Sequence, residues 1–337
     1  MRMVGNRSIT GRASQILPWV LLVTLALLPA VGLSANITRL FFITLVWTTT
    51  SVAWNLLGGF AGQVSFGFAV FYGLGAYTAA LMIDAGVSPY HSFLASAVVA
   101  AIASFLIGLP TFRLRGPYFA IATIGVIEAV RVVMNNIAIT GGASGFRIRE
   151  HARFHQAEHY HTALFAAAMA VAISIAVSRS RFGLALRAIR QDEDAAAGLG
   201  VNPYLCKLLV HALAAALTGV AGGIYARYAA YIHPQGVFAF ATSVSILLMP
   251  VIGGIGTVWG AVLGGVIFGI VEEELVANFP QIHLLLYGTL LILIVLLEPD
   301  GLLGLLRKLF RRHSEHSESD GPDQILWGRS RLEGREL

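Results

Sequence analysis

Charged residues inside apolar stretches are the first candidates for chemistry. Glu128 and Arg131 lie three residues apart in the apolar segment 118–136, so on a helix they share one face and can form an ion pair. A charge near the centre of a bilayer costs about 2.5–3.5 kcal/mol on insertion scales, so a pair at that depth needs a reason. Three interpretations stay open: a structural contact pointing into a helix bundle, a part of a solute path, or a proton relay through Glu128.

Two glycine-rich stretches, 58–67 and 253–260, each follow an apolar run in comparable parts of the two halves of the chain. Glycine allows close helix packing in membranes, and it also marks breaks in spanning helices whose freed backbone groups line a cavity. Both interpretations remain open, and uncharged polar groups beside such a break could hold an ammonium or a carboxylate. The candidate path residues are Asn55, Gly59, Gln63, Ser65, Glu128, Arg131, Gly253 and Gly254.

Histidines recur at a four-residue spacing that suits a shared metal ion: His151, His155 and His159. Cysteine does not accompany them, because Cys206 is the only one in the chain. A contact with another protein or a solvated loop explains them better, so we predict no metal site. An intramembrane hydrolase would need a base inside an apolar segment, and the mid-chain candidate, His211, has no obvious serine nucleophile beside it. We predict no catalytic residue.

Tyrosines at the end of another apolar run are typical of a membrane interface. Tyr225, Tyr228 and Tyr231 surround Arg227, and the pattern predicts an aromatic belt that anchors this helix end.

Nucleotide binding is not expected of this chain. A phosphate-binding P-loop needs a lysine directly after glycine, and the only lysines, Lys207 and Lys308, follow a cysteine and an arginine. We therefore expect no cofactor on this chain; if ATP and Mg²⁺ drive its function, a partner subunit binds them.

The composition predicts that these residues are positioned by membrane-spanning helices. Of 337 residues 56% are hydrophobic and only 12% are charged, against about 25% charged in an ordinary soluble domain. A spanning helix needs about 20 apolar residues, and we expect an all-α, polytopic bundle of about ten spans. The basic residues lie in short loops, which argues against nucleic acid. The predicted spans are 17–33, 38–57, 64–83, 92–110, 118–136, 160–178, 207–231, 241–256, 259–276 and 282–298.

The distribution of lysine and arginine orients these spans. With the N-terminus inside, 14 of these residues fall on the cytoplasmic side and 4 on the external side, as the positive-inside rule requires. Both termini are then cytoplasmic. A cleaved signal peptide within the first span is the alternative, and it would leave nine spans.

The longest cytoplasmic loop, 179–206, mixes apolar and charged residues. We expect a short helix from about Gly183 to Gly198 or Gly200, stopped by Pro203. It is either a solvated amphipathic segment or, as we favour, a docking surface for another cytoplasmic protein.

Sequence motifs in this loop and beyond it resemble a known family. Asp194, Ala195, Ala196 and Gly200 resemble the EAA–xxx–G loop of ABC-importer permeases, although the Ile-x-Leu-Pro that normally follows is absent. Residues 40–304 as a whole resemble the LivM-like permeases of branched-chain amino acid ABC importers, with one departure at Pro250, which should kink its span. The matching stretches are 55–67 (NLLGGFAGQVSFG), 114–123 (LRGPYFAIAT), 128–131 (EAVR), 140–142 (TGG), 183–190 (GLALRAIR), 248–257 (LMPVIGGIGT) and 301–304 (GLLG).

The resemblance implies a bacterial inner-membrane transport subunit without enzyme activity. Its partners would be a second homologous permease subunit, two cytoplasmic ATPase subunits and a periplasmic solute-binding protein. Residues 1–16 would be a cytoplasmic segment, 17–312 the permease domain and 313–337 a disordered cytoplasmic tail. The coupling residues would be Arg187, Arg190, Asp194, Ala195, Ala196 and Gly200. A permease for urea or short amides and a proton-coupled secondary transporter are the alternatives.

Overall fold

The computed structural model describes residues 34–114, 116–149, 156–278, 282, 285, 286, 288, 289 and 301–304. Its long helices are α2 (Ala35–Asn55), α3 (Phe68–Asp84), α4 (Pro89–Thr111), α5 (Pro117–Asn136), α6 (Gln156–Arg179), α9 (Pro203–Ala229), α11 (Phe240–Gly253) and α12 (Val258–Asn278). The short elements are the π-helix η2 (Leu56–Phe60), the 3₁₀ turns η3 (Ala138–Thr140) and η4 (Gly142–Ser144), the helices α7 (Arg181–Gln191), α8 (Glu193–Gly198) and α10 (Pro234–Val237), and the paired strands β1 (Phe146–Arg147) and β2 (Tyr231–Ile232).

Local sequence signals start several of these helices. Proline stands in the first turn of α4, α5 and α9, where its missing N–H costs no hydrogen bond. The Ser34 side chain accepts from Ile37 N at the start of α2, and the Asn202 side chain accepts from Leu205 N at the start of α9. The first residue of each of these helices is therefore determined by residues close to it in the sequence.

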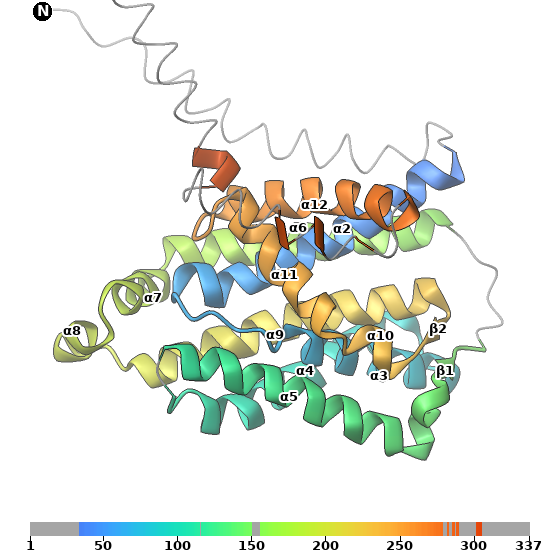
Figure 1. The fold of residues 1–337 in the computed structure, drawn as a ribbon, viewed down its shortest axis with the longest axis horizontal. Helices are drawn as coiled ribbons and strands as arrows, with labels where there is room; N and C mark the ends of the chain where they lie inside the picture. The colour runs from blue at the N-terminus through green and yellow to red at the C-terminus, as the bar shows by residue number, and fades with distance from the viewer. Residues whose placement is uncertain are drawn as a thin grey trace, which may run out of the picture.

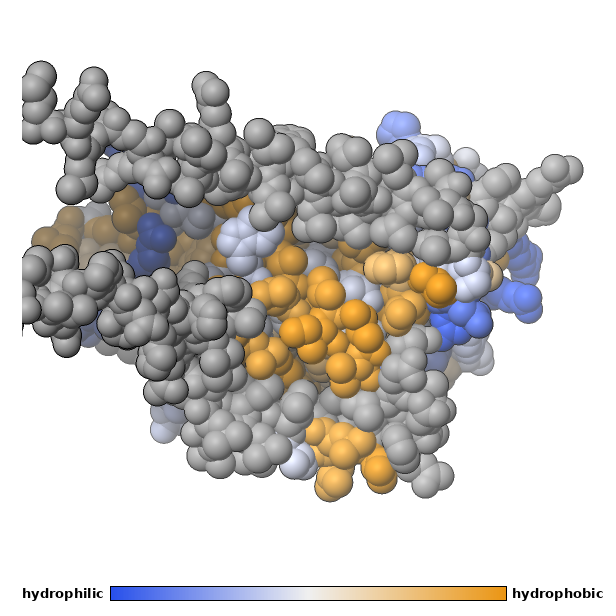
Figure 2. All heavy atoms as spheres, turned by 90° about the horizontal axis from the view of Figure 1, so that it is seen from above, coloured by the Kyte–Doolittle hydropathy of each residue, from blue (hydrophilic) through white to orange (hydrophobic). Residues whose placement is uncertain are grey.

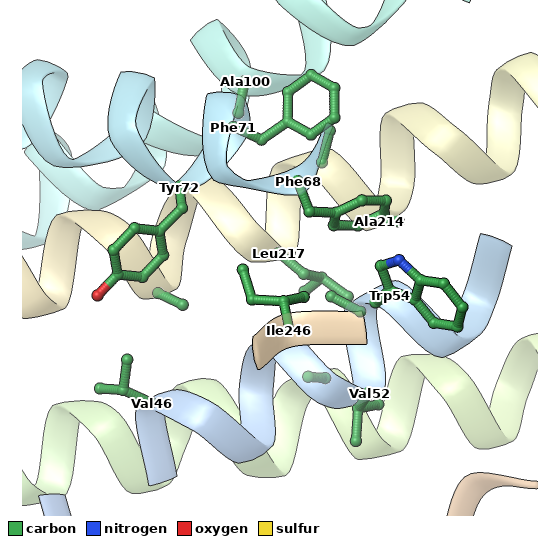
Figure 3. Packing of buried hydrophobic residues seen from close by; sticks show 14 of the residues in the cluster. Val46, Val52, Trp54, Phe68, Phe71, Tyr72, Ala100, Ala214, Leu217 and Ile246 are labelled. Atoms are coloured by element: carbon green, nitrogen blue, oxygen red, sulfur yellow. The ribbon is translucent and has the colours of Figure 1, made fainter. Parts of the chain in front are cut away.

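The long helices lie side by side and form one bundle (Figure 1). Helix α9 packs against α3 and α4, while α2 packs against α12, α6 and α9. Large side chains fill the space between them, among them Trp54, Phe68 and Leu217 (Figure 3). Helices α7 and α8, which contain most of the predicted coupling residues, are at one end of the bundle, and we call 181–200 the coupling segment after that prediction. Strands β1 and β2 are at the opposite end.

Glycines bring α3 and α9 into close contact. A Cβ atom added at Gly222 would lie 2.0 Å from Tyr72 O, and one at Gly75 would lie 2.1 Å from Gly219 O. Contacts this short leave no room for a methyl group, so small residues set the distance between the two helices.

Within the part of the chain that the structure describes, six helices are long and apolar enough to cross a membrane, and α3 and the first part of α12 are shorter apolar helices. These eight elements correspond to eight of the predicted spans; 17–33 lies outside the described residues, as does most of 282–298. One face of the molecule is hydrophobic in its middle and hydrophilic toward its ends (Figure 2). The all-α prediction fits the described residues, where the only strands are two residues long. Residues 1–16 and 313–337 are not among the described residues.

The predicted single helix in the loop 179–206 is wrong in one respect. The chain forms two helices, α7 and α8, with Asp192 between them in an extended conformation (φ −157°). The Asp192 side chain accepts from the backbone N–H groups of Asp194 and Ala195, both at 2.9 Å. This cap starts a new helix and so ends the first one.

Candidate coupling and translocation site

The first glycine-rich stretch breaks a spanning helix. After α2 the chain forms the π-turn η2, and residues 61–67 then run without helical structure to α3. Side chains bind the backbone of this segment: Trp54 Nε1 donates to Ser65 O at 2.8 Å, and Phe66 N donates to Thr123 Oγ1 on α5 at 3.1 Å. At membrane depth such partners are required, because lipid offers none.

The second glycine-rich stretch is also a break. Helix α11 ends at Gly253, and Gly254 and Gly256 follow with φ of +129° and +82°, which favour glycine. The Thr257 hydroxyl then accepts from Gly260 N at 3.0 Å in the first turn of α12. Pro250 lies inside α11, and its carbonyl accepts the N–H of Gly254.

Asn55 joins the two breaks. Its Nδ2 donates to Thr257 O at 3.0 Å, and its Oδ1 accepts from Gly256 N at 2.9 Å. The two backbones are so close that a Cβ atom on Gly59 would lie 2.8 Å from Gly256 N. We call residues 58–62 and 253–257 the glycine junction. The two stretches are closely packed and each ends a helix, and their place on a solute path stays a prediction.

Two of the polar candidate residues at the junction, Asn55 and Ser65, form hydrogen bonds with backbone groups. Asn55 and Ser65 are buried, and the Ser65 hydroxyl accepts from Gly67 N at 3.1 Å. Gln63 is half-buried, whereas Gly62 and Val64 are exposed. Contact of Asn55, Gln63 or Ser65 with a solute stays a prediction, and the hydrogen bonds assign Asn55 a structural role as well.

The coupling segment has an anchored inner side and an exposed outer side. Ala196 is buried, and Glu193 Oε2 accepts from Lys207 Nζ at 2.5 Å, which fastens α8 to the base of α9. Lys207 shows only 7% of its side chain. The exposed residues of the segment include Leu184, Arg187, Asp194, Ala195, Leu199 and Gly200.

Arg190 differs from the other predicted coupling residues. Although the residue as a whole is exposed, its Nη1 donates to Gly59 O at 2.6 Å. The guanidinium is also close to Gly256, where an added Cβ atom would lie 2.1 Å from Nη1. Arg187, by contrast, donates from Nη2 to Ser178 O at 3.1 Å at the surface. Arg190 therefore turns toward the glycine junction.

The ion pair on α5 forms as predicted, but not inside the bundle. Arg131 Nη2 donates to Glu128 Oε1 at 2.5 Å, and 34% of the Arg131 side chain and 59% of the Glu128 side chain are exposed. In the single chain the pair is therefore partly exposed, and Arg131 is the more buried of the two residues. The pair borders a cavity of about 210 Å³ between α5 and α10–α11, lined also by Ile124, Ile127, Phe238 and Phe240.

The tyrosines of the predicted aromatic belt also contact neighbouring helices: Tyr225 and Tyr228 are half-buried, whereas Tyr231 is exposed. Tyr228 stacks on Phe42 of α2, with ring centroids 4.2 Å apart, and the buried Arg227 donates to Glu158 Oε1 of α6 at 2.8 Å. Tyr231 donates its hydroxyl to Ser144 O. Helices α2 and α6 cover part of this end of α9, and the role of the tyrosines as an interface belt stays a prediction.

Histidines do not form a metal site within the described part of the chain, where no group of three or more His, Cys, Asp or Glu could hold an ion. His159 is buried and meets the rings of Phe42 and Tyr228 edge to face. His151 and His155 lie outside the described residues. His211, the one base considered for a hydrolase, is surrounded by phenylalanines.

The chain is similar in sequence to known proteins. A family profile described as "branched-chain amino acid transport system / permease component" matches residues 36–295. The chain belongs to this permease family. It is similar to the high-affinity branched-chain amino acid transport system permease protein LivM of Salmonella typhimurium, at 30% identity over 308 residues, which cover 82% of this chain and 72% of the relative.

Further relatives of this permease come from Escherichia coli. LivM of strain K12 is 30% identical over 296 residues (79% of this chain, 69% of the relative), and LivH is 27% identical over 280 residues (75% and 90%). No solved structure matches the chain. The permease is thus a multi-pass protein of the inner membrane, and its apolar helices agree with that.

Sequence reasoning missed the groups that hold the broken segments of the permease. Thr123 on α5 and Ser243 on α11 bind the backbone of Phe66 and Ala69, and Thr257 starts α12. A small hydroxyl residue in an apolar run is a common sequence feature. Only the adjacency of α5 and α11 to segment 61–67 distinguishes these from the many others.

Proposed function

We propose that this chain is a transmembrane permease subunit of an ATP-driven ABC importer for branched-chain or other hydrophobic amino acids. The observation that carries the proposal is the α7–α8 segment, which projects from one end of the bundle, exposes Leu184 and Leu199, and is anchored on its inner side to the broken helices. Exposed leucines beside charged residues suit a docking surface for another protein.

Two cytoplasmic ATPase subunits are the proposed partners for this surface. They bind ATP and Mg²⁺, because this chain has no P-loop lysine. Closure of the ATPases would move α7–α8, and the inner contacts of that segment would pass the movement to the spans. The positive-inside rule supports a cytoplasmic position for α7–α8, with Arg179, Arg181, Arg187 and Arg190 in or beside it.

The solute path is proposed to run along the exposed face of α5. Glu128 lies 11 residues after Pro117, or about 16 Å along a helix, which is close to the middle of a bilayer of about 30 Å. A charged pair at this depth is unfavourable toward lipid. A second homologous permease subunit opposite this face would enclose the pair in an aqueous path, and a periplasmic binding protein would deliver solute to its outer end.

Reconstitution tests the function directly. The chain is placed in liposomes with a second permease and an ATPase subunit, and solute-binding protein is added outside. We expect ATP-dependent uptake of leucine, isoleucine and valine, and ATPase activity that rises when the loaded binding protein is added. Liposomes that lack the ATPase subunit are the control.

Two other results would replace the proposal. Uptake of urea or short amides in preference to amino acids would select the amide permease. Uptake by this chain alone, driven by a pH gradient, would select a proton-coupled transporter that uses Glu128.

A further inference from the structure

We propose that Arg190 is a positioning residue that ties the coupling helix α7 to both broken helices of the glycine junction. The inference rests on the proposed function and assigns to Arg190 a task other than contact with the ATPase. Its guanidinium donates to Gly59 O in the first break and lies beside the backbone of Gly256 in the second. A displacement of α7 would therefore move both breaks together.

The first contact is with the end of α2. The carbonyls in the last turn of a helix have no partner within the helix, and they carry partial negative charge. Gly59 O is in this position at the end of η2, and it accepts from Arg190 Nη1 at 2.6 Å. A hydrogen bond from a charged donor is roughly twice as strong as a neutral one, so this is a firm attachment.

Glycines make room for this attachment. A Cβ atom at Gly62 would lie 2.8 Å from Arg190 Cγ, and one at Gly256 would lie 2.1 Å from Nη1 and 3.1 Å from Gly59 O. The side chain therefore passes along one glycine segment and ends beside the other. Any larger residue at Gly256 would displace the guanidinium.

The second break is tied in through Asn55. Its amide holds Gly256 N and Thr257 O, and it belongs to the same helix end that Arg190 caps. Arg190, Gly59, Asn55 and Gly256 thus form one connected set of contacts between α7, α2 and the α11–α12 turn. The inner face of α7, with Leu186 and Ile189 buried, keeps the base of Arg190 fixed relative to this set.

Substitution of Arg190 tests the inference in the complete reconstituted complex. We expect Arg190→Ala to keep the amount of ATPase subunit bound and the basal ATPase rate, but to lower solute uptake per ATP hydrolysed by about tenfold or more. Arg190→Lys keeps the charge and one donor, and it should recover part of the loss. Arg113→Ala, at an exposed arginine elsewhere on the cytoplasmic end, is the matched control and should couple normally.

Loss of the ATPase subunit from the Arg190→Ala complex would overturn the inference, because it would make Arg190 a docking residue. Unchanged uptake per ATP would overturn it as well. A wild-type complex that takes up no amino acid would instead contradict the proposed function, so the two failures are distinguishable.

A disulfide can replace the attachment within a single polypeptide. Gly62 has a φ of +71°, so a cysteine there is strained in both redox states, and the comparison of oxidised with reduced protein of the same variant controls for folding. A Cβ atom at Gly62 would lie 3.3 Å from Arg190 Cβ, near the separation of about 3.5–4.5 Å in disulfides. In a Cys206→Ser background, the variant Gly62→Cys with Arg190→Cys should transport more per ATP when oxidised than when reduced. Equal coupling in the two states would refute the attachment.

Discussion

At the scale of single residues, the chemistry of this chain is mostly the binding of backbone by side chains. Asn55 is fully buried and spans two breaks, and Trp54 and Thr123 hold the non-helical segment between α2 and α3. Each of these bonds satisfies a backbone group that no helix satisfies and that lipid could not. Polar residues in the apolar core therefore maintain the broken geometry on which the proposed path depends.

Replacement of Asn55 by alanine should destabilise the subunit. It leaves Gly256 N and Thr257 O without these partners at a half-buried place, and an unsatisfied buried group costs up to about 1–3 kcal/mol. We expect a lower unfolding midpoint in detergent, measured by thermal denaturation. Asn136→Ala is the control, because the Asn136 amide is exposed and bonds only to Val132 O of its own helix. Equal midpoints for the two variants would contradict a structural role for Asn55.

At the scale of elements, a cap decides the shape of the coupling segment. The composition of 181–200 would allow one helix, but Asp192 accepts two backbone N–H groups and starts α8 in a new direction. The ion pair between Glu193 and Lys207 then holds α8 against α9. The two short helices expose Leu184 on α7 and Leu199 directly after α8, on the surface proposed to bind an ATPase subunit.

Loss of this cap should loosen α8 alone. Asp192→Ala removes an N-cap worth about 1 kcal/mol, whereas Asp192→Asn keeps an accepting oxygen at the same place. We expect faster amide hydrogen exchange in residues 193–198 for the alanine variant and nearly normal exchange for the asparagine variant. Normal exchange in both would show that the Glu193–Lys207 pair is sufficient to hold the helix.

At the scale of the whole molecule, the exposed faces of α4 and α5 differ in a way that assigns their surroundings. The exposed face of α4 is apolar, with Leu94, Ile102 and Leu106, and the helix has no Asp, Glu, Lys or Arg. That face suits lipid. The neighbouring face of α5 has Glu128 and Arg131 in the second half of the helix, together with the cavity beside Phe238.

A photo-reactive residue can locate the second permease subunit. We expect benzoylphenylalanine at Ile121, on the exposed face of α5, to give a cross-link to the second subunit in the assembled complex. Leu106 on α4 is the matched control, since it is similarly exposed (67% against 64%). A cross-link from position 106 and none from 121, seen as a shifted band on a denaturing gel, would move the interface away from α5.

The positions of the helices could be predicted from the sequence, because the signals for a helix are local. Apolar runs predict eight of the described elements to within a few residues, and motif order predicts the family. The fold class needed no contact between distant residues.

The contacts of the candidate residues could not be predicted from the sequence, because they join residues that are far apart in the chain. Arg190 meets Gly59 across 131 positions, and Asn55 meets Gly256 across 201. The Glu128–Arg131 pair was predictable from its spacing, but its exposure depends on which face of α5 the neighbouring helices cover. Periodicity shows which residues share a face, whereas the direction of that face depends on packing between elements far apart in the chain.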